Sequence, residues 1–304
     1  MLQFQPPGFG QHVIRTSLGV MAYYTPTSAP WRTGNEQEPY PPLIFLHSLG
    51  GGSSAYEWSK VYPAFAPAFR VIAPDLIGWG QSTHPVRDYQ IDDYLLMLTE
   101  LIEGTGSKPA TVVASSLTAG ITLRLATQRP DLFQQLYLVC PSGYGDFGSD
   151  YSRGIAAQLA GIPGLDRLLY GAGAANETAV RSFLQQFLFA ERSRITDEMV
   201  AAYVASAQQL NAEYAALASL KGNLCFDLAL YMETLTVPTV MLWGDKAWFS
   251  TLKTGQRLSK LNPRPIKAFH TIPNSGVLPH LETPELVIGL LQSHLRYHQE
   301  PETD

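Results

Sequence analysis

The residues that could carry out chemistry in this sequence lie in four short segments, each at the end of an apolar run of strand length or directly after one. In chain order the segments are 47–52 (HSLGGG), 75–82 (DLIGWGQS), 114–119 (ASSLTA) and 243–246 (WGDK). The third segment contains Ser116, whose hydroxyl is the candidate nucleophile. A serine hydroxyl is a weak nucleophile unless a nearby base takes its proton, so any reaction depends on the side chains that the fold brings to Ser116.

These segments need strands and helices to position them, and the hydrophobic pattern predicts both. Residues 11–24, split by Ser17-Leu18-Gly19, are typical of an antiparallel hairpin. Helical patterns occur at 54–65, 91–104 and 117–128. Apolar or β-branched runs of strand length occur at 43–46, 70–73, 111–114, 136–140, 239–243 and 266–271. Runs without polar alternation, spaced by helices, predict parallel strands that are covered on both faces.

The strand pattern stops between about residues 143 and 236. Helical stretches at 155–159, 178–189 and 196–218 fill this interval, and a final helix is expected from 284 to 298. The sequence therefore predicts a single α/β domain. Its core would comprise residues 1–142 and 237–304, and residues 143–236 would form a helical block inserted between two strands of one sheet.

Taken together and in this order, the four segments resemble the α/β-hydrolase superfamily over about residues 11–298. The resemblance implies the α/β-hydrolase fold, with an eight-stranded, mostly parallel sheet, helices on both faces and the inserted block as a lid. It places Ser116 at the nucleophile of a G-x-S-x-G elbow, with Ala114 and Thr118 at the two glycine positions. It also implies that the backbone N–H groups of Leu49 and Leu117 form the oxyanion hole.

Apolar residues stand where the resemblance places the other two members of a catalytic triad. The family's acid commonly follows a strand in a W-G-x-x-D pattern, and Ala247 stands at its position here. The family's histidine typically lies in a G-H-x-x-H-x-E-like stretch, and Val277 replaces it, whereas His280 matches a second, non-catalytic histidine. Loss of a triad member typically lowers turnover by a factor on the order of 10⁴–10⁶. The sequence therefore predicts a degenerate triad.

Other side chains remain candidates for a rebuilt triad. The candidate acids are Asp146, which follows the strand run ending at Cys140, and Asp245, two residues before Ala247. The candidate bases are His280 and His270, although the strand pattern around His270 favours a structural role. A base within hydrogen-bond reach of Ser116 would indicate activity.

Apolar residues at the positions of the acid and the histidine predict an apolar pocket above Ser116. The lid aromatic residues are expected mostly to pack on the sheet, with a minority lining this space. His47 belongs to the glycine-rich loop and is expected to be structural, and Ser115 could be mistaken for the nucleophile if the register slipped by one. The candidate pocket residues are His47, Ser48, Ser115, Trp248 and Phe249.

Composition and charge narrow the possible classes of function. The net charge is −5 and the 21 basic residues are scattered, which argues against nucleic acid as a partner. No apolar run approaches 18 residues, so no membrane-spanning helix is expected. Residues 1–10 do not have the pattern of a signal peptide, and Cys140 and Cys225 are expected to be reduced. The default expectation is a cytoplasmic protein.

No cofactor or metal is indicated, because the glycine-rich loop has neither the Walker lysine nor the dinucleotide-binding spacing. Three hypotheses remain. The favoured one is a non-catalytic member that binds an apolar small molecule, by analogy with plant hormone receptors of this fold that lost the triad histidine. The alternatives are a serine hydrolase that acts on ester-like bonds with an unusual arrangement around Ser116, and a scaffold with a filled pocket. The oligomeric state is left open.

Overall fold

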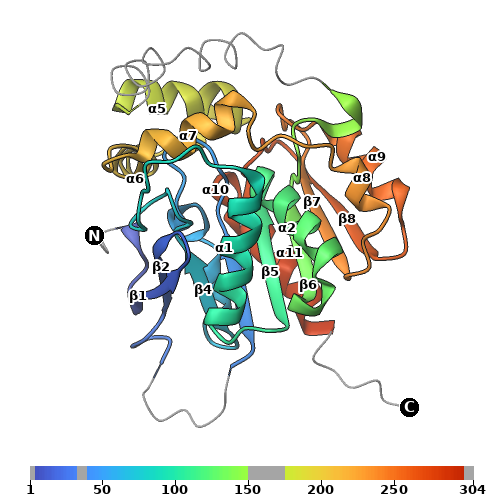
Figure 1. The fold of residues 1–304 in the computed structure, drawn as a ribbon, viewed down its shortest axis with the longest axis horizontal. Helices are drawn as coiled ribbons and strands as arrows, with labels where there is room; N and C mark the ends of the chain where they lie inside the picture. Colours follow the sequence, from blue (N-terminus) through green and yellow to red (C-terminus); the bar gives the residue numbers. More distant parts are fainter. Residues whose placement is uncertain (1–3, 33–39, 150–174, 298–304) are drawn as a thin grey trace.

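A single eight-stranded sheet forms the centre of the protein in the computed structural model, which describes residues 4–32, 40–149 and 175–297. The strand order is β1-β2-β4-β3-β5-β6-β7-β8 (Figure 1). The first two strands form an antiparallel hairpin, β2 pairs antiparallel with β4, and every pair from β4 to β8 is parallel. The predicted sheet, mostly parallel and eight-stranded, is confirmed.

Every predicted strand is present. The strands are β1 (Phe9–Thr16), β2 (Gly19–Pro26), β3 (Pro42–Leu46), β4 (Arg70–Pro74), β5 (Ala110–Ser115), β6 (Phe133–Val139), β7 (Thr239–Gly244) and β8 (Ile266–Ile272). The α-helices within the described ranges are α1 (Ile91–Gly104), α2 (Ser116–Gln128), α5 (Glu177–Phe183), α6 (Asp197–Ala207), α7 (Ala212–Lys221), α8 (Ala229–Met232), α9 (Leu252–Leu261), α10 (Pro279–Glu282) and α11 (Pro284–Tyr297).

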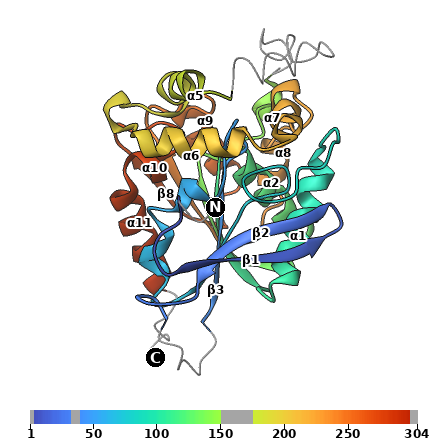
Figure 2. The same ribbon diagram turned by 90° about the vertical axis from the view of Figure 1, so that its left-hand side faces the viewer.

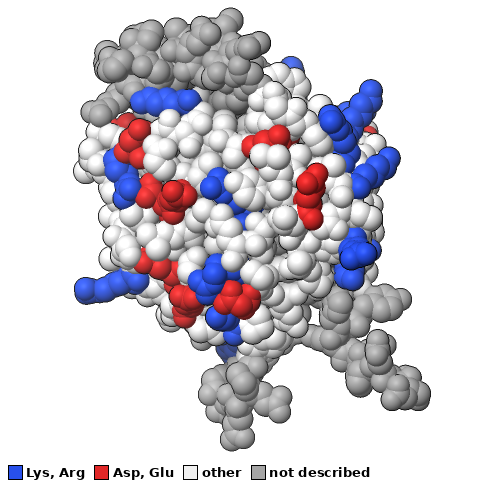
Figure 3. Space-filling view, turned by 45° about the vertical axis from the view of Figure 1, so that its right-hand side comes forward, with Lys and Arg blue, Asp and Glu red and all other residues white. Residues whose placement is uncertain are grey.

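Helices cover both faces of the sheet. Figure 2 shows α1 and α2 on one side of the strands and α10 and α11 on the other. All six residues of β5 and all six of β7 are buried, as expected for parallel strands between two helical layers. Acidic and basic side chains are interspersed over most of the face in Figure 3. Within the described residues, no helix has the length and apolar character needed to cross a membrane.

The described part of the inserted helical block contains α5, α6, α7 and α8, between β6 and β7 in the chain. In Figure 1 the first three of these helices lie beyond one end of the sheet. The helix expected over 196–218 is two helices, because Asn211 before α7 adopts a left-handed conformation with φ of 66°. The helix expected over 178–189 changes to a π-helical turn at Leu184–Leu188, and the one expected over 155–159 lies outside the described residues.

The helix predicted for residues 54–65 is wrong. Two short 3₁₀ turns, Ala55–Trp58 and Tyr62–Phe65, occupy this stretch. Pro63 lies in the second turn and has no N–H to donate to a carbonyl four residues earlier, which disfavours a continuous α-helix. The helix α9 was not predicted, because its polar sequence has few apolar residues to mark a buried face.

Candidate functional site

Ser116 lies on a sharp turn between β5 and α2. Its φ of 55° is in the left-handed region, which costs a residue other than glycine about 1–3 kcal/mol and is typical of functional elbows. This geometry forms although Thr118 stands at a glycine position. The backbone of α2 closely approaches the chain after β6 at Gly120, where a Cβ would overlap the carbonyl oxygen of Ser142. Thr118 is fully buried.

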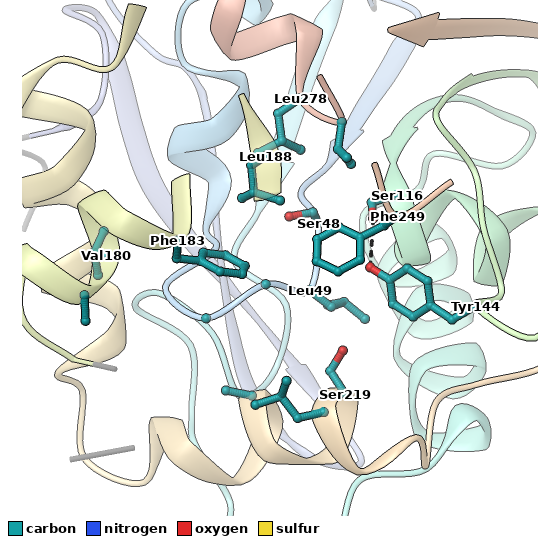
Figure 4. Close-up of a pocket in the computed structure, with 16 residues that line it drawn as sticks. Ser48, Leu49, Ser116, Tyr144, Val180, Phe183, Leu188, Ser219, Phe249 and Leu278 are labelled. Atoms are coloured by element: carbon teal, nitrogen blue, oxygen red, sulfur yellow. Dashed lines mark hydrogen bonds between the residues drawn. The ribbon is translucent and has the colours of Figure 1, made fainter. Parts of the chain in front are cut away.

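The hydroxyl of Ser116 contacts a tyrosine. The distance from Ser116 Oγ to Tyr144 Oη is 3.3 Å. A dashed line marks this contact in Figure 4. Tyr144 follows β6 and has a φ of 61°. Its N–H donates to Ser142 Oγ at 2.9 Å, and Ser142 Oγ donates to the Asp146 carboxylate at 2.8 Å. The segment after β6 therefore holds Tyr144 in place. Sequence reasoning placed Tyr144 among the aromatic residues of the lid and missed this contact.

The two positions that the resemblance assigns to the lost acid and base are buried. Val277 lines the same cavity as Ser116, and its N–H donates to the carbonyl oxygen of Leu188 at 2.9 Å. Ala247 lies in the turn after β7, with its N–H directed to the Gly244 carbonyl oxygen. Neither side chain can take or hold a proton.

The described histidines make contacts away from Ser116. His280 is fully buried, stacks on Trp58 with ring centroids 3.8 Å apart, and has no hydrogen-bond partner within the described chain. Burial lowers the pKa of His280, and the nearby Glu57 opposes this effect. His270 on β8 lies 2.7 Å from His294 on α11, between their Nε2 atoms. In residues 4–32, 40–149 and 175–297, no imidazole nitrogen forms a hydrogen bond with Ser116 Oγ.

The candidate acids have structural partners. Asp146 accepts hydrogen bonds from Ser142 Oγ and from the N–H groups of Gly143 and Leu228. Asp245 accepts a long hydrogen bond of 3.4 Å from the N–H of Ser275. No histidine donates to either carboxylate in the described part of the chain, so these contacts do not form the acid–base pair of a triad.

A buried carboxylate below the glycine-rich loop was also missed. Glu57 accepts hydrogen bonds from the N–H and Oγ of Ser48, at 2.7 and 2.8 Å, and from Tyr203 Oη at 2.9 Å. Burial alone raises the pKa of Glu57, but His280, 3.9 Å away, together with His47 and the Ser48 N–H, lowers it to about 2. The ionised carboxylate links the loop to α6. The available signal in the sequence was a single glutamate between two aromatic residues, Tyr56 and Trp58.

The two backbone groups predicted to form an oxyanion hole are unpaired. Leu49 lies in the loop after β3, and Leu117 directly follows Ser116 at the start of α2. Both residues are buried, yet neither N–H donates a hydrogen bond to an acceptor within the described residues. Buried backbone N–H groups are rarely left without an acceptor. These two donors are therefore available to an oxygen atom of a bound molecule.

A cavity of about 310 Å³ lies above Ser116, at the lower end of the range of small-molecule sites. The helices α5 and α7 and the π-helical turn at Leu184–Leu188 contribute part of its wall, and segments at the carboxyl ends of the strands contribute the rest (Figure 4). Its lining is mostly apolar. The lining residues are Ser48, Leu49, Gly50, Gly51, Ser116, Tyr144, Ala179, Val180, Phe183, Leu188, Ala216, Ser219, Leu220, Phe249, Val277 and Leu278.

Three of the predicted pocket residues do not line this cavity. His47 is buried beneath it, where the Leu76 N–H donates to Nε2 and Nδ1 contacts the Ser48 carbonyl oxygen. Ser115 is the last residue of β5, and its buried side chain points away, because successive residues of a strand alternate in direction. Trp248 is 62% exposed, and its ring packs against that of Phe187. Ser48 and Phe249 line the cavity.

Comparison with known proteins bears on the fold. An α/β hydrolase fold family profile matches residues 41–284. The hydrolase YugF of Bacillus subtilis, itself uncharacterized, is 25% identical over 88% of this chain and 92% of its own length. A haloalkane dehalogenase of Bradyrhizobium diazoefficiens is 36% identical over 96 residues. That match spans 32% of this chain and 30% of the dehalogenase. An uncharacterized Mycobacterium tuberculosis protein is also matched over 30% of its length, so the chain spans less than a third of these two relatives.

Solved structures extend the likeness over nearly the whole chain. A serine hydrolase of carbazole degradation, CarC, superposes with a TM-score of 0.74 at 18% identity, covering 95% of this chain and 99% of that one. A variant of the meta-cleavage product hydrolase CumD of Pseudomonas fluorescens gives a TM-score of 0.74 at 20% identity, covering 97% of this chain and 100% of that one. The family profile spans well over half of the sequence and agrees with the sheet described above. The chain therefore belongs to the α/β hydrolase fold family.

Proposed function

We propose that this protein binds an apolar small molecule in the cavity above Ser116 and does not hydrolyse it. One observation carries the proposal. Ser116 Oγ contacts the phenol of Tyr144 at 3.3 Å and forms no hydrogen bond with an imidazole among the described residues. Without a base to take its proton, the hydroxyl is a poor nucleophile. The open, mostly apolar cavity supports binding over the scaffold hypothesis, which needs a filled pocket.

We also propose that residues 143–236 act as a lid. The described part of this block supplies Ala179, Val180 and Phe183 from α5 and Ala216, Ser219 and Leu220 from α7 to the cavity wall. A ligand in the cavity would therefore contact both the helical block and the strand ends. The cytoplasmic location expected from the sequence remains a prediction.

A serine hydrolase that uses Ser116 is the second candidate. The strained elbow and the two unpaired N–H groups are features that acyl transfer requires. Relatives that match about a third of the chain carry hydrolytic names, such as a 2-hydroxymuconate semialdehyde hydrolase of Pseudomonas, 33% identical over 104 residues. A hydrolase of this kind requires a base for Ser116 other than the histidines in the described part of the chain.

Restoring the two lost side chains tests the proposal. We expect Ala247→Asp with Val277→His to raise 4-nitrophenyl butyrate hydrolysis by about 10²-fold or more, because general-base catalysis typically contributes 10²–10⁴-fold. The cavity beside Val277 offers room for the imidazole. A fluorophosphonate probe should label the double variant much faster than the wild type.

Adding Ser116→Ala to the double variant is the control and should abolish both the hydrolysis and the labelling. Brisk labelling of the wild-type protein that disappears in Ser116→Ala would contradict the proposal and favour the hydrolase. A double variant that folds but stays inert would contradict the positions assigned to the acid and the base.

A further inference from the structure

We propose that Tyr144 and Ser116 together recognise one uncharged, hydrogen-bond-accepting oxygen, such as a ketone, ester or lactone carbonyl, on an otherwise apolar ligand. The inference rests on the proposed function and assigns Tyr144 as the positioning residue that sets specificity. In triad enzymes an imidazole is hydrogen-bonded to the serine. Here the Ser116 hydroxyl contacts a phenol, that of Tyr144, at 3.3 Å.

The direction of the Tyr144–Ser116 hydrogen bond follows from the chemistry of the two hydroxyls. A phenol is more acidic than an aliphatic alcohol and is therefore the stronger donor. With Tyr144 Oη–H donating to Ser116 Oγ, the proton of Ser116 is left for another acceptor. Because Ser116 Oγ has no other hydrogen-bond partner among the described residues and Ser116 lines the cavity, that acceptor is an atom of the ligand.

The backbone holds Tyr144 so that this contact is preformed. The residue adopts φ of 61°, and its N–H is fixed by Ser142 Oγ at 2.9 Å. Its ring packs against Phe249, with centroids 5.9 Å apart, on the cavity wall. A side chain held by its own backbone and by a ring neighbour loses little freedom when a ligand binds, so the hydrogen bond contributes more of its strength to affinity.

The polar groups around Ser116 Oγ specify what the ligand presents. The Ser116 hydroxyl and the unpaired N–H groups of Leu49 and Leu117 are all donors, so together they suit an acceptor oxygen. No Asp, Glu, Lys or Arg lines the cavity in the part of the chain that the structure describes. A carboxylate would lose its hydration without gaining a cationic partner, which is costly. An uncharged oxygen avoids that cost.

Three probes with nearly the same shape test the inference by calorimetric titration. They are 4-phenylbutan-2-one, butylbenzene, which replaces the carbonyl by a methylene, and 3-phenylpropanoate, which replaces the methyl ketone by a carboxylate. We expect the wild type to bind the ketone and butylbenzene, and the carboxylate more weakly than the ketone. Tyr144→Phe and Ser116→Ala should each weaken ketone binding by about three- to tenfold, the value of one hydrogen bond.

Two readouts separate this role from a merely structural one. Butylbenzene has no acceptor, so its affinity should change less than about twofold in either variant. Because both hydroxyls act in one chain of hydrogen bonds, the double variant should bind the ketone no more weakly than the weaker single variant. Tyr231→Phe, the same change on α8 at a residue that does not line the cavity, should leave all affinities unchanged.

The contrary outcomes are distinct. If the probes bind and Tyr144→Phe leaves ketone affinity unchanged, or weakens butylbenzene equally, the role of Tyr144 is wrong and the proposed function stands. Carboxylate binding as tight as that of the ketone would overturn the preference for an uncharged oxygen. Binding of none of the three probes would overturn the proposed function as well. Circular dichroism spectra that match the wild type establish that each variant is folded.

Discussion

Among single residues, Glu57 shows how hydrogen bonds can stabilise a buried charge. Its carboxylate is fully buried and accepts three hydrogen bonds, two from Ser48 and one from Tyr203. An ionised carboxylate without such donors would be strongly destabilising in the protein interior. The pairing keeps Glu57 charged and fixes the start of the glycine-rich loop, whose next residue, Leu49, carries an unpaired N–H.

Replacing Glu57 by Gln should make stability less dependent on pH. The folded-state pKa of Glu57 is lowered from 4.5 to about 2, so its ionisation stabilises the fold above the unfolded-state pKa. That contribution, about 3 kcal/mol, is lost as the pH falls from about 5 to about 2. Urea unfolding should therefore show a constant difference between wild type and Glu57→Gln above about pH 5.5 that shrinks at lower pH.

The exposed Glu233, just after α8, provides the matched control for this measurement. Glu233→Gln should change the unfolding free energy by less than about 0.5 kcal/mol at every pH. A Glu57→Gln difference that stays constant down to pH 2 would show that Glu57 is not the group whose pKa is lowered.

Among the elements, the loop between β8 and α10 and the segment after α5 support each other. Glu282 in α10 accepts hydrogen bonds from the N–H groups of Ala190 and Glu191, at 2.9 and 3.0 Å, and from the N–H of Gly276. The Val277 N–H donates to the Leu188 carbonyl oxygen. Hydrogen bonds from the Glu282 side chain and from the Val277 backbone thus attach this loop to the inserted helical block, and the loop depends on close backbone approach at Gly276.

Gly276→Ala should destabilise the protein by about 2 kcal/mol or more, because its Cβ would overlap the backbone carbonyl oxygen of Leu188. Backbone atoms cannot move aside as a flexible side chain can. Gly289→Ala in α11 is the matched control, since a Cβ there meets no atom within 4 Å. In an exposed helix position, alanine should stabilise the fold by about 0.5–1 kcal/mol. Denaturant midpoints of the two variants should therefore shift in opposite directions.

Equal shifts of the two midpoints, or a stabilised Gly276→Ala protein, would contradict the close packing of this loop against the helical block. The same variants also report on the cavity. Because Val277 and Leu188 both line it, a displaced loop in Gly276→Ala should also weaken binding of butylbenzene.

At the scale of the whole molecule, the cavity lies between two parts that are far apart in the sequence. The sheet core contributes the loop after β3 and the turn before α2, and the inserted block contributes α5 and α7. Ser206 on α6 donates to the Ser53 carbonyl oxygen at 2.9 Å, which fastens the block to the glycine-rich loop. This hydrogen bond helps to position the block over the strand ends. The cavity between the block and the strand ends is lined mostly by apolar side chains.

Filling the cavity from the helical block should prevent binding without unfolding the protein. Ala216 on α7 lines the cavity, and Ala216→Leu would place three more carbon atoms there. We expect the affinity for butylbenzene to fall by about tenfold or more, which corresponds to the contacts of about two methylene groups. Ala201→Leu on the exposed side of α6 should leave the affinity unchanged. An unaltered affinity in Ala216→Leu would place the binding site elsewhere.

The sequence by itself determined the fold class and the strands. Short-range signals carry this information: apolar runs mark buried strands, and four motifs in a fixed order mark the loops at their ends. The family and the sheet are confirmed. The roles of Ser116, Ala247 and Val277 remain predictions, although the cavity beside Ser116 and Val277 gives them a place to be tested. The 54–65 helix failed because Pro63 outweighed its helical pattern.

Only the tertiary structure decided which side chains meet. Tyr144 contacts Ser116 across 28 positions, and Tyr203 reaches Glu57 across 146 positions. No periodicity or motif spacing encodes such pairs, because they depend on how β6 and the inserted helices return to the ends of the strands. Whether the space above Ser116 was open or filled was likewise undetermined, since aromatic residues at helical spacing can pack or line a cavity. Packing between segments that are distant in the sequence determines both which side chains meet and whether the space above Ser116 is open.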